Sequence, residues 1–84
     1  MTLAVNPNPA ESFINISYNL TETSNVNIFV FDLQSRLIQQ VHTGLQVSGK
    51  YQFDLNISSL EAGIYLLMLQ TQTNTVTKKI FVSR

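Results

Sequence analysis

The chain has 84 residues, no cysteine, and five basic residues balanced by five acidic ones. This length corresponds to one domain, and the absence of cysteine excludes disulfides and thiolate metal sites. Only 12% of the residues are charged, and their balance gives no field that would attract nucleic acid or an anionic membrane. No apolar stretch approaches the roughly 20 residues that a membrane-spanning helix needs. The composition therefore predicts a polar, weakly charged domain that binds no nucleic acid.

The first part of the chain alternates in the manner of half-buried strands. Residues 3–5 are a brief apolar start, stopped at residues 6–9, where two prolines keep the backbone extended or turned. Residues 13–20 alternate cleanly between apolar and polar side chains, which indicates a strand with one buried face. Residues 21–25 have the composition of a turn, and residues 26–32 form the next strand.

The middle of the chain contains a turn, a weak strand and a convincing one. Residues 32–36 predict a tight turn, because an aspartate at its start can accept hydrogen bonds from its own backbone. Residues 37–43 form a weaker strand with mixed faces. Gly44 and Gly49 then predict a loop, after which residues 51–57 alternate strictly.

The longest apolar run, residues 60–70, is the expected centre of the fold. A short run without a polar break is typical of a strand buried on both faces. Just before it, Leu60, Gly63 and Tyr65 have the spacing of a tyrosine corner, in which a tyrosine hydroxyl bonds to upstream backbone. A last strand over residues 75–82 ends almost at the end of the chain. About seven short strands separated by turns predict an all-β, immunoglobulin-like antiparallel sandwich.

Residues capable of catalysis are scattered. The single histidine, His42, has no acidic residue within five positions and is expected to be a surface or half-buried structural residue. The five acidic residues occur singly, and the three glycines are too far apart for a phosphate-binding loop. The sequence therefore predicts no enzyme activity, no catalytic residue, no cofactor, no metal site and no small-molecule substrate.

One pair of aromatic residues leaves two interpretations open. Phe29 and Phe31 lie opposite the apolar face formed by Val26, Ile28 and Val30. Either both faces of this strand are covered, which is the favoured expectation, or the two rings form an exposed apolar strip for a partner or a sugar ring. Such a strip would also allow weak self-association.

Five segments carry short motifs that are considered together: residues 6–10 (Asn-Pro-Asn-Pro-Ala), 16–20, 30–33, 60–65 (Leu-Glu-Ala-Gly-Ile-Tyr) and 76–82. Each motif is weak alone, but their order and spacing over nearly the whole chain are specific. Together they resemble the C-terminal sorting domain of the type IX (Por) secretion system of Bacteroidetes.

The resemblance implies what the domain does and where. It implies an immunoglobulin-like sandwich at the end of a secreted protein, recognised by an outer-membrane translocon as an export signal. It further implies that a sortase-like surface peptidase then removes the domain. The partners would be the translocon and this peptidase, and the location would be the cell surface or medium, reached through the periplasm and outer membrane. Residues 1–84 would be one sorting domain, a fragment of a longer protein.

By position, the resemblance assigns recognition roles to seven residues, and two other residues depart from the family pattern. The seven are Pro7, Asn8, Pro9, Gly63, Tyr65, Lys78 and Lys79. An aromatic residue often stands where this chain has Asn6, and a glycine usually stands where it has Ser35, which accepts a positive φ less readily. The departures put the packing of the first motif and the tightness of the turn in question.

Two other classes of function remain as alternatives. One is a carbohydrate-binding or adhesive immunoglobulin-like module, which requires an exposed row of aromatic residues. The other is a structural spacer of the fibronectin kind, which would work at any place in a longer chain.

Overall fold

The computed structural model describes residues 2–7 and 9–83, except for the side chain of Thr43. This part of the chain folds into seven strands, which confirms the predicted all-β class, and none of its segments is a helix that could span a membrane. The strands are β1 (Leu3–Asn6), β2 (Phe13–Leu20), β3 (Ser24–Phe31), β4 (Leu37–Gln46), β5 (Gly49–Asn56), β6 (Gly63–Gln70) and β7 (Thr75–Val82).

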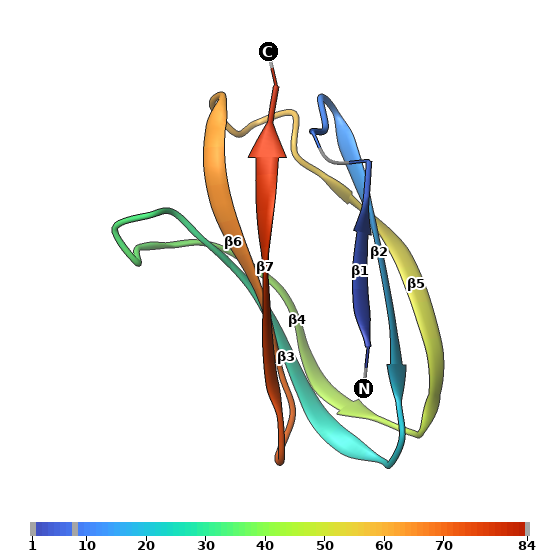
Figure 1. Cartoon of the computed structure of the whole chain (residues 1–84). Helices are drawn as coiled ribbons and strands as arrows, with labels where there is room; N and C mark the ends of the chain where they lie inside the picture. The colour runs from blue at the N-terminus through green and yellow to red at the C-terminus, as the bar shows by residue number, and fades with distance from the viewer. Residues whose placement is uncertain (1, 8, 84) are drawn as a thin grey trace.

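The strands form two antiparallel sheets that face one another (Figure 1). One sheet has three strands in the order β1-β2-β5, and the other has four in the order β4-β3-β6-β7. The chain passes from the second sheet to the first through the short turn between β4 and β5. Neither sheet can bury its apolar face alone, so the two inner faces pack on each other, as expected for an immunoglobulin-like sandwich.

The alternation in β2 and β3 is confirmed by the packing between the sheets. Ile14 and Ile16 of β2 are fully buried, as are Ile28 and Val30 of β3. The buried apolar residues form one continuous core. The turn before β3 is shorter than predicted, because β3 already begins at Ser24, whose hydroxyl accepts a hydrogen bond from the backbone N–H of Gln72.

The prediction that the central strand is buried on both faces is wrong. β6 does lie inside its sheet, between β3 and β7, but only its inner side chains are buried, and Leu66 and Met68 on the other face are partly exposed. The reason is the layer count: in a two-layer sandwich each sheet has one face toward solvent. An apolar run does not reveal whether a second layer covers it.

The predicted loop around the two glycines is also wrong. Gly44 lies inside β4 and Gly49 opens β5, so the connection between the strands shrinks to Val47 and Ser48. Both glycines have φ near +150° (149° and 151°), which a residue without Cβ reaches at little steric cost. Pairing with β3 and β2 carries the strands through these positions, and overrides the local signal for a break.

Candidate functional site

The first and last strands of the chain are tied together at one end of the sandwich. The backbone N–H of Ala10 donates to the carbonyl of Phe81 (2.8 Å), and the N–H of Ser83 donates to the carbonyl of Ala10 (2.8 Å). These bonds make a parallel bridge between Ala10 and Val82. Since β1 belongs to the other sheet, the segment between β1 and Ala10 crosses from one sheet to the other (Figure 1).

The two described prolines of the first motif lie in this crossing segment. Pro7 and Pro9 are both exposed, and neither has an N–H with which to continue a strand ladder. They therefore end the pairing of β1 just before Ala10 starts to pair with β7. Asn8, the third residue of the motif, lies outside the described residues.

Gly63 and Tyr65 stand beside the same end of β7. Gly63 opens β6 directly opposite Val82, and Tyr65 is opposite Ile80. The Tyr65 hydroxyl donates to the backbone carbonyl of Glu61 (2.7 Å), four residues upstream. The predicted tyrosine corner is confirmed. Because the Tyr65 side chain is buried, it acts as an anchor for the loop before β6 and offers little surface to a partner.

The two lysines lie in the middle of β7, before the end that pairs with Ala10, and both are exposed. Lys78 is opposite Leu67 and points to the inner side of the sheet, whereas Lys79 is opposite Leu66 and points to the outer side. Since β7 is an edge strand, Lys78 can extend its ammonium past the rim into water. The lysines therefore present charge on two sides of one strand.

The described residues of the assigned set therefore lie on β7 or beside it. Pro9 reaches β7 through Ala10, Gly63 and Tyr65 reach it through β6, and both lysines belong to it. Sequence reasoning missed Ala10, which makes the link itself. No local signal marks it, because its partner, Val82, lies near the other end of the sequence.

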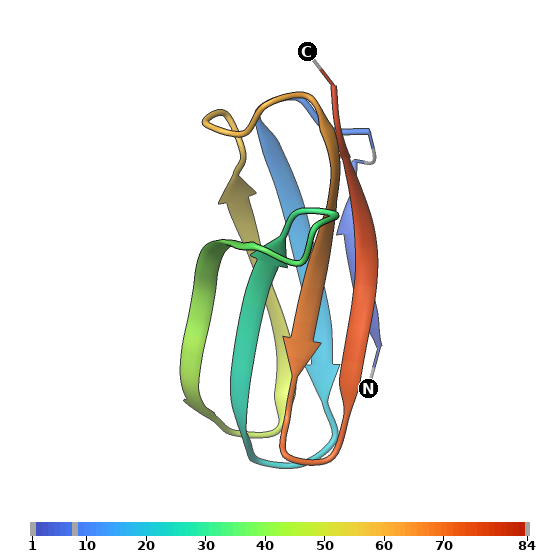
Figure 2. The ribbon, with the colours of Figure 1, turned by 90° about the vertical axis from the view of Figure 1, so that its left-hand side faces the viewer.

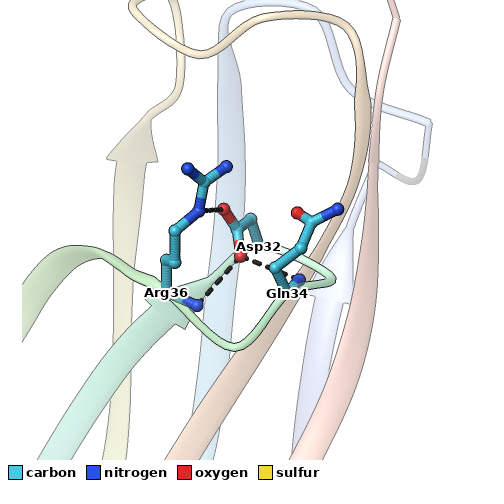
Figure 3. A network of polar contacts seen from close by, with 3 residues as sticks. All are labelled: Asp32, Gln34 and Arg36. Carbon is cyan, nitrogen blue, oxygen red and sulfur yellow. Dashed lines mark hydrogen bonds and ion pairs between the residues drawn. The ribbon is translucent and has the colours of Figure 1, made fainter.

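The turn between β3 and β4 is built around Asp32 (Figure 3). One carboxylate oxygen accepts the backbone N–H groups of Gln34 and Arg36, both at 2.9 Å, and the other accepts Arg36 Nε at 2.7 Å. The backbone bond from Arg36 is the main cause that lowers the pKa of Asp32 below its ordinary value. The predicted turn is confirmed. Ser35 adopts a φ of 65°, a conformation that glycine adopts with less strain.

An open groove separates this turn from the loop that leads into β6. Its volume is about 420 Å³, and Arg36 and Glu61 lie on its opposite walls. The Arg36 side chain is exposed and already paired with Asp32, so its charge is largely compensated. The groove offers space beside the tyrosine corner without a concentrated charge.

His42 is half-buried, as expected, and lies at the side of the sandwich opposite β7. Its Nε2 atom is buried and has no hydrogen-bond partner among the described residues. It lines a cleft of about 290 Å³ together with Tyr18 and Tyr51, whose rings stack at 5.3 Å. The described residues contain no group of three or more acidic or histidine side chains that could hold a metal ion.

Phe29 and Phe31 are half-buried, which fits neither extreme of the two interpretations. Their ring centroids are 5.9 Å apart and the rings are tilted by 52°. They lie on the outer face of the four-stranded sheet, beside Leu66 and Met68 of β6. The favoured expectation of a covered face is therefore only partly met, and the rings do not form a flat exposed row.

The chain was compared with known families and with curated proteins, and no curated protein matches it. The family described as the secretion system C-terminal sorting domain matches residues 4–83, which includes every strand from β2 to β7 and most of β1. The chain therefore belongs to the family of type IX secretion C-terminal sorting domains.

Proposed function

We propose that this domain is the export signal of a secreted protein and that the outer-membrane translocon of type IX secretion recognises it in folded form. The observation that carries the proposal is the family match over residues 4–83. A domain of this family is a signal and not a catalyst, so its chemistry is recognition. After export, a sortase-like surface peptidase removes the domain, and the protein remains at the cell surface or in the medium.

Within this function the described residues of the assigned set fall into two roles. Pro7 and Pro9 guide the chain to the Ala10 bridge, and Gly63 and Tyr65 fix the start of β6; these residues position β7. Lys78 and Lys79 are the candidates for direct contact, because both are exposed and differ in the face they serve. A negatively charged receptor surface that grips the edge of β7 would meet both ammonium groups.

The decisive experiment fuses the chain to the C-terminus of a fluorescent reporter that carries a signal peptide. In a Bacteroidetes host with an intact translocon, we expect the reporter outside the cell and the domain absent from the released protein by mass spectrometry. In the same host without the translocon, the reporter stays in the periplasm. A reporter that stays in the periplasm of the intact host, with the domain folded and other cargo exported, would refute the proposal.

The role of the lysines can be separated from the fold. The double variant Lys78→Gln with Lys79→Gln should reduce export about tenfold or more, if the two charges together contribute about 1.4 kcal/mol to binding. Lys50→Gln, at an exposed lysine of β5 in the other sheet, is the matched control and should export normally. Equal export of both variants would exclude the lysines from recognition, and a lowered melting temperature of the double variant would assign them to the fold.

The positioning role of Tyr65 has a different signature. Tyr65→Phe keeps the ring but removes the hydrogen bond to Glu61, and should lower the free energy of unfolding by about 1 kcal/mol. Export should persist at temperatures where the variant is folded. Lost export by a fully folded Tyr65→Phe variant would instead mean that the translocon reads the hydroxyl.

A further inference from the structure

The two edges of the four-stranded sheet are protected very differently. β7 carries Lys78 and Lys79, and the bridge to Ala10 covers its C-terminal end. β4, at the opposite edge, has ten residues and stands at the outer margin of the sheet in Figure 2. An uncovered edge strand is a template for another strand, and proteins normally block it with charge, proline or bulges.

The β4 edge lacks the first two of these protections. From Leu37 to Gly49 the sequence contains no lysine, arginine, aspartate, glutamate or proline. The segment also exposes apolar side chains, since Leu45 is 69% exposed and Val47, in the following turn, is 66% exposed. This edge therefore carries no charged side chain that would repel an approaching strand.

Bulges protect only one half of β4. The pairing with β3 shifts register between Ile28 and Phe29 and again between Val30 and Phe31, so the first half of β4 is irregular. From His42 to Gln46 the pairing is continuous, opposite Ser24 to Ile28. The regular half is therefore the part of the edge that can accept another strand.

A second copy of this chain is the partner that these features fit. In an antiparallel pairing across a twofold axis, the edge meets itself, so an uncharged strand meets an uncharged strand. The same pairing through β7 would bring Lys78 and Lys79 of two copies together and would be repelled. In this pairing Gly44, in the middle of the regular half, lies opposite Gly44 of the second copy, so no two side chains crowd each other at the centre of the contact.

We propose that His42 to Gln46 of β4 pairs with the same segment of a second copy, which joins two four-stranded sheets into one continuous sheet. Five residues of strand span about 17 Å, and such a contact buries less than the roughly 1,200 Å² of a standard stable interface. The dimer is therefore weak and forms in the micromolar to millimolar range.

Sedimentation velocity over a concentration series tests the proposal. The chain should shift from monomer to dimer between about 10 μM and 1 mM. Leu45→Lys places like charges in the facing edges and should weaken the dimer at least about tenfold. Leu33→Lys is the matched control, because it makes the same change at an exposed leucine (57%) outside β4, and should dimerise as the parent does.

Two further results decide the case. Both variants must melt at the temperature of the parent chain, and amide hydrogen exchange should slow with concentration in β4 while that of β7 stays constant. A chain that remains monomeric throughout the range would overturn the proposal. A dimer that Leu45→Lys leaves intact, or whose exchange slows in β7, would place the interface elsewhere and overturn it equally.

Discussion

The outer faces of the two sheets have opposite chemistry, although both sheets contribute to one core. On the three-stranded sheet, Asn15 links two neighbours on β5: its Nδ2 donates to Asp54 (2.9 Å) and its Oδ1 accepts from Gln52 (3.0 Å). On the four-stranded sheet, the corresponding face carries the half-buried rings of Phe29 and Phe31. One face is a polar ladder across strands, and the other is an apolar layer without a cover from the described chain.

This difference shows that the fold constrains only the inner side chains. Both sheets place mainly apolar side chains toward the core, with Lys78 at the edge of β7 as an exception, whereas the outward positions are free to differ. The apolar layer also belongs to the sheet that contains β7, where Lys79 is opposite Leu66. The four-stranded sheet therefore combines an outward apolar layer with the exposed lysines of the proposed recognition strand.

The largest expected effect measures how far the inner and outer faces of β6 differ. Leu67→Ala, at a fully buried position, should lower the free energy of unfolding by about 2–5 kcal/mol. Leu66→Ala, next to it but half-exposed, should cost only about 1 kcal/mol. Urea unfolding of both variants gives the comparison, and equal losses would mean that the outer face is covered in solution.

The second effect concerns the apolar layer itself. Phe31→Ala should cost about 1–2 kcal/mol, since roughly half of the burial of a core phenylalanine is lost. A double-mutant cycle with Phe29→Ala should show a coupling of about 0.5–1.5 kcal/mol from the tilted ring pair. Strict additivity of the two losses would show that the rings do not support each other.

A smaller effect lies in the turn that closes β3 and β4. Ser35→Gly removes the cost of about 1–2 kcal/mol for a left-handed backbone. It also raises the conformational entropy of the unfolded chain, which lowers the free energy of unfolding by about 0.5–1 kcal/mol. We expect a net gain in the free energy of unfolding of about 0.5 kcal/mol. Ser35→Val should be destabilising in the same assay, and a loss of stability in Ser35→Gly would contradict the assigned strain.

On the polar face, Asn15→Ala should cost only a few tenths of a kcal/mol to about 0.5 kcal/mol, because water replaces exposed hydrogen bonds. Chemical unfolding beside Leu66→Ala would rank the two outer faces. A loss as large as that of Phe31→Ala would mean that the polar ladder holds its sheet together.

The last comparison concerns pH dependence at the Asp32 turn, where two backbone N–H groups hold the carboxylate and water screens its ion pair with the exposed Arg36. Folding lowers the pKa of Asp32, so its contribution is complete above the ordinary value near 4 and is lost as the pH falls through the lower folded value. Melting temperatures from pH 7 to pH 2 should therefore fall less steeply in Asp32→Asn than in the parent. Identical acid profiles would show that Asp32 has no share in acid unfolding.

Local patterns predicted the local parts of this structure. The alternation of residues 13–20 was sufficient for β2, and the spacing of Leu60, Gly63 and Tyr65 was sufficient for the tyrosine corner, because both depend on neighbouring residues. The Asp32 turn was predictable for the same reason, since its acceptor and donors are at most four residues apart.

Features that depend on distant partners were missed or misjudged. Gly44 alone predicts the end of a strand, but pairing with β3 continues the strand through it. The exposure of Leu66 depends on the number of layers in the fold. The bridge from Ala10 to Val82 joins the two ends of the sequence, and no local pattern reports it. The same holds for the unpaired edge of β4, which is visible only when the strand order is known.

The bridge between Ala10 and Val82 also makes the fold depend on the last strand of the domain. A chain that ends before β7 leaves Ala10 without Val82 as a partner and leaves the β7 side of β6 unpaired. If export requires the folded domain, a prematurely terminated protein carries no valid signal. A series of C-terminal truncations should then lose cooperative unfolding and export at the same residue, and the domain would act as a proofreading step for finished cargo.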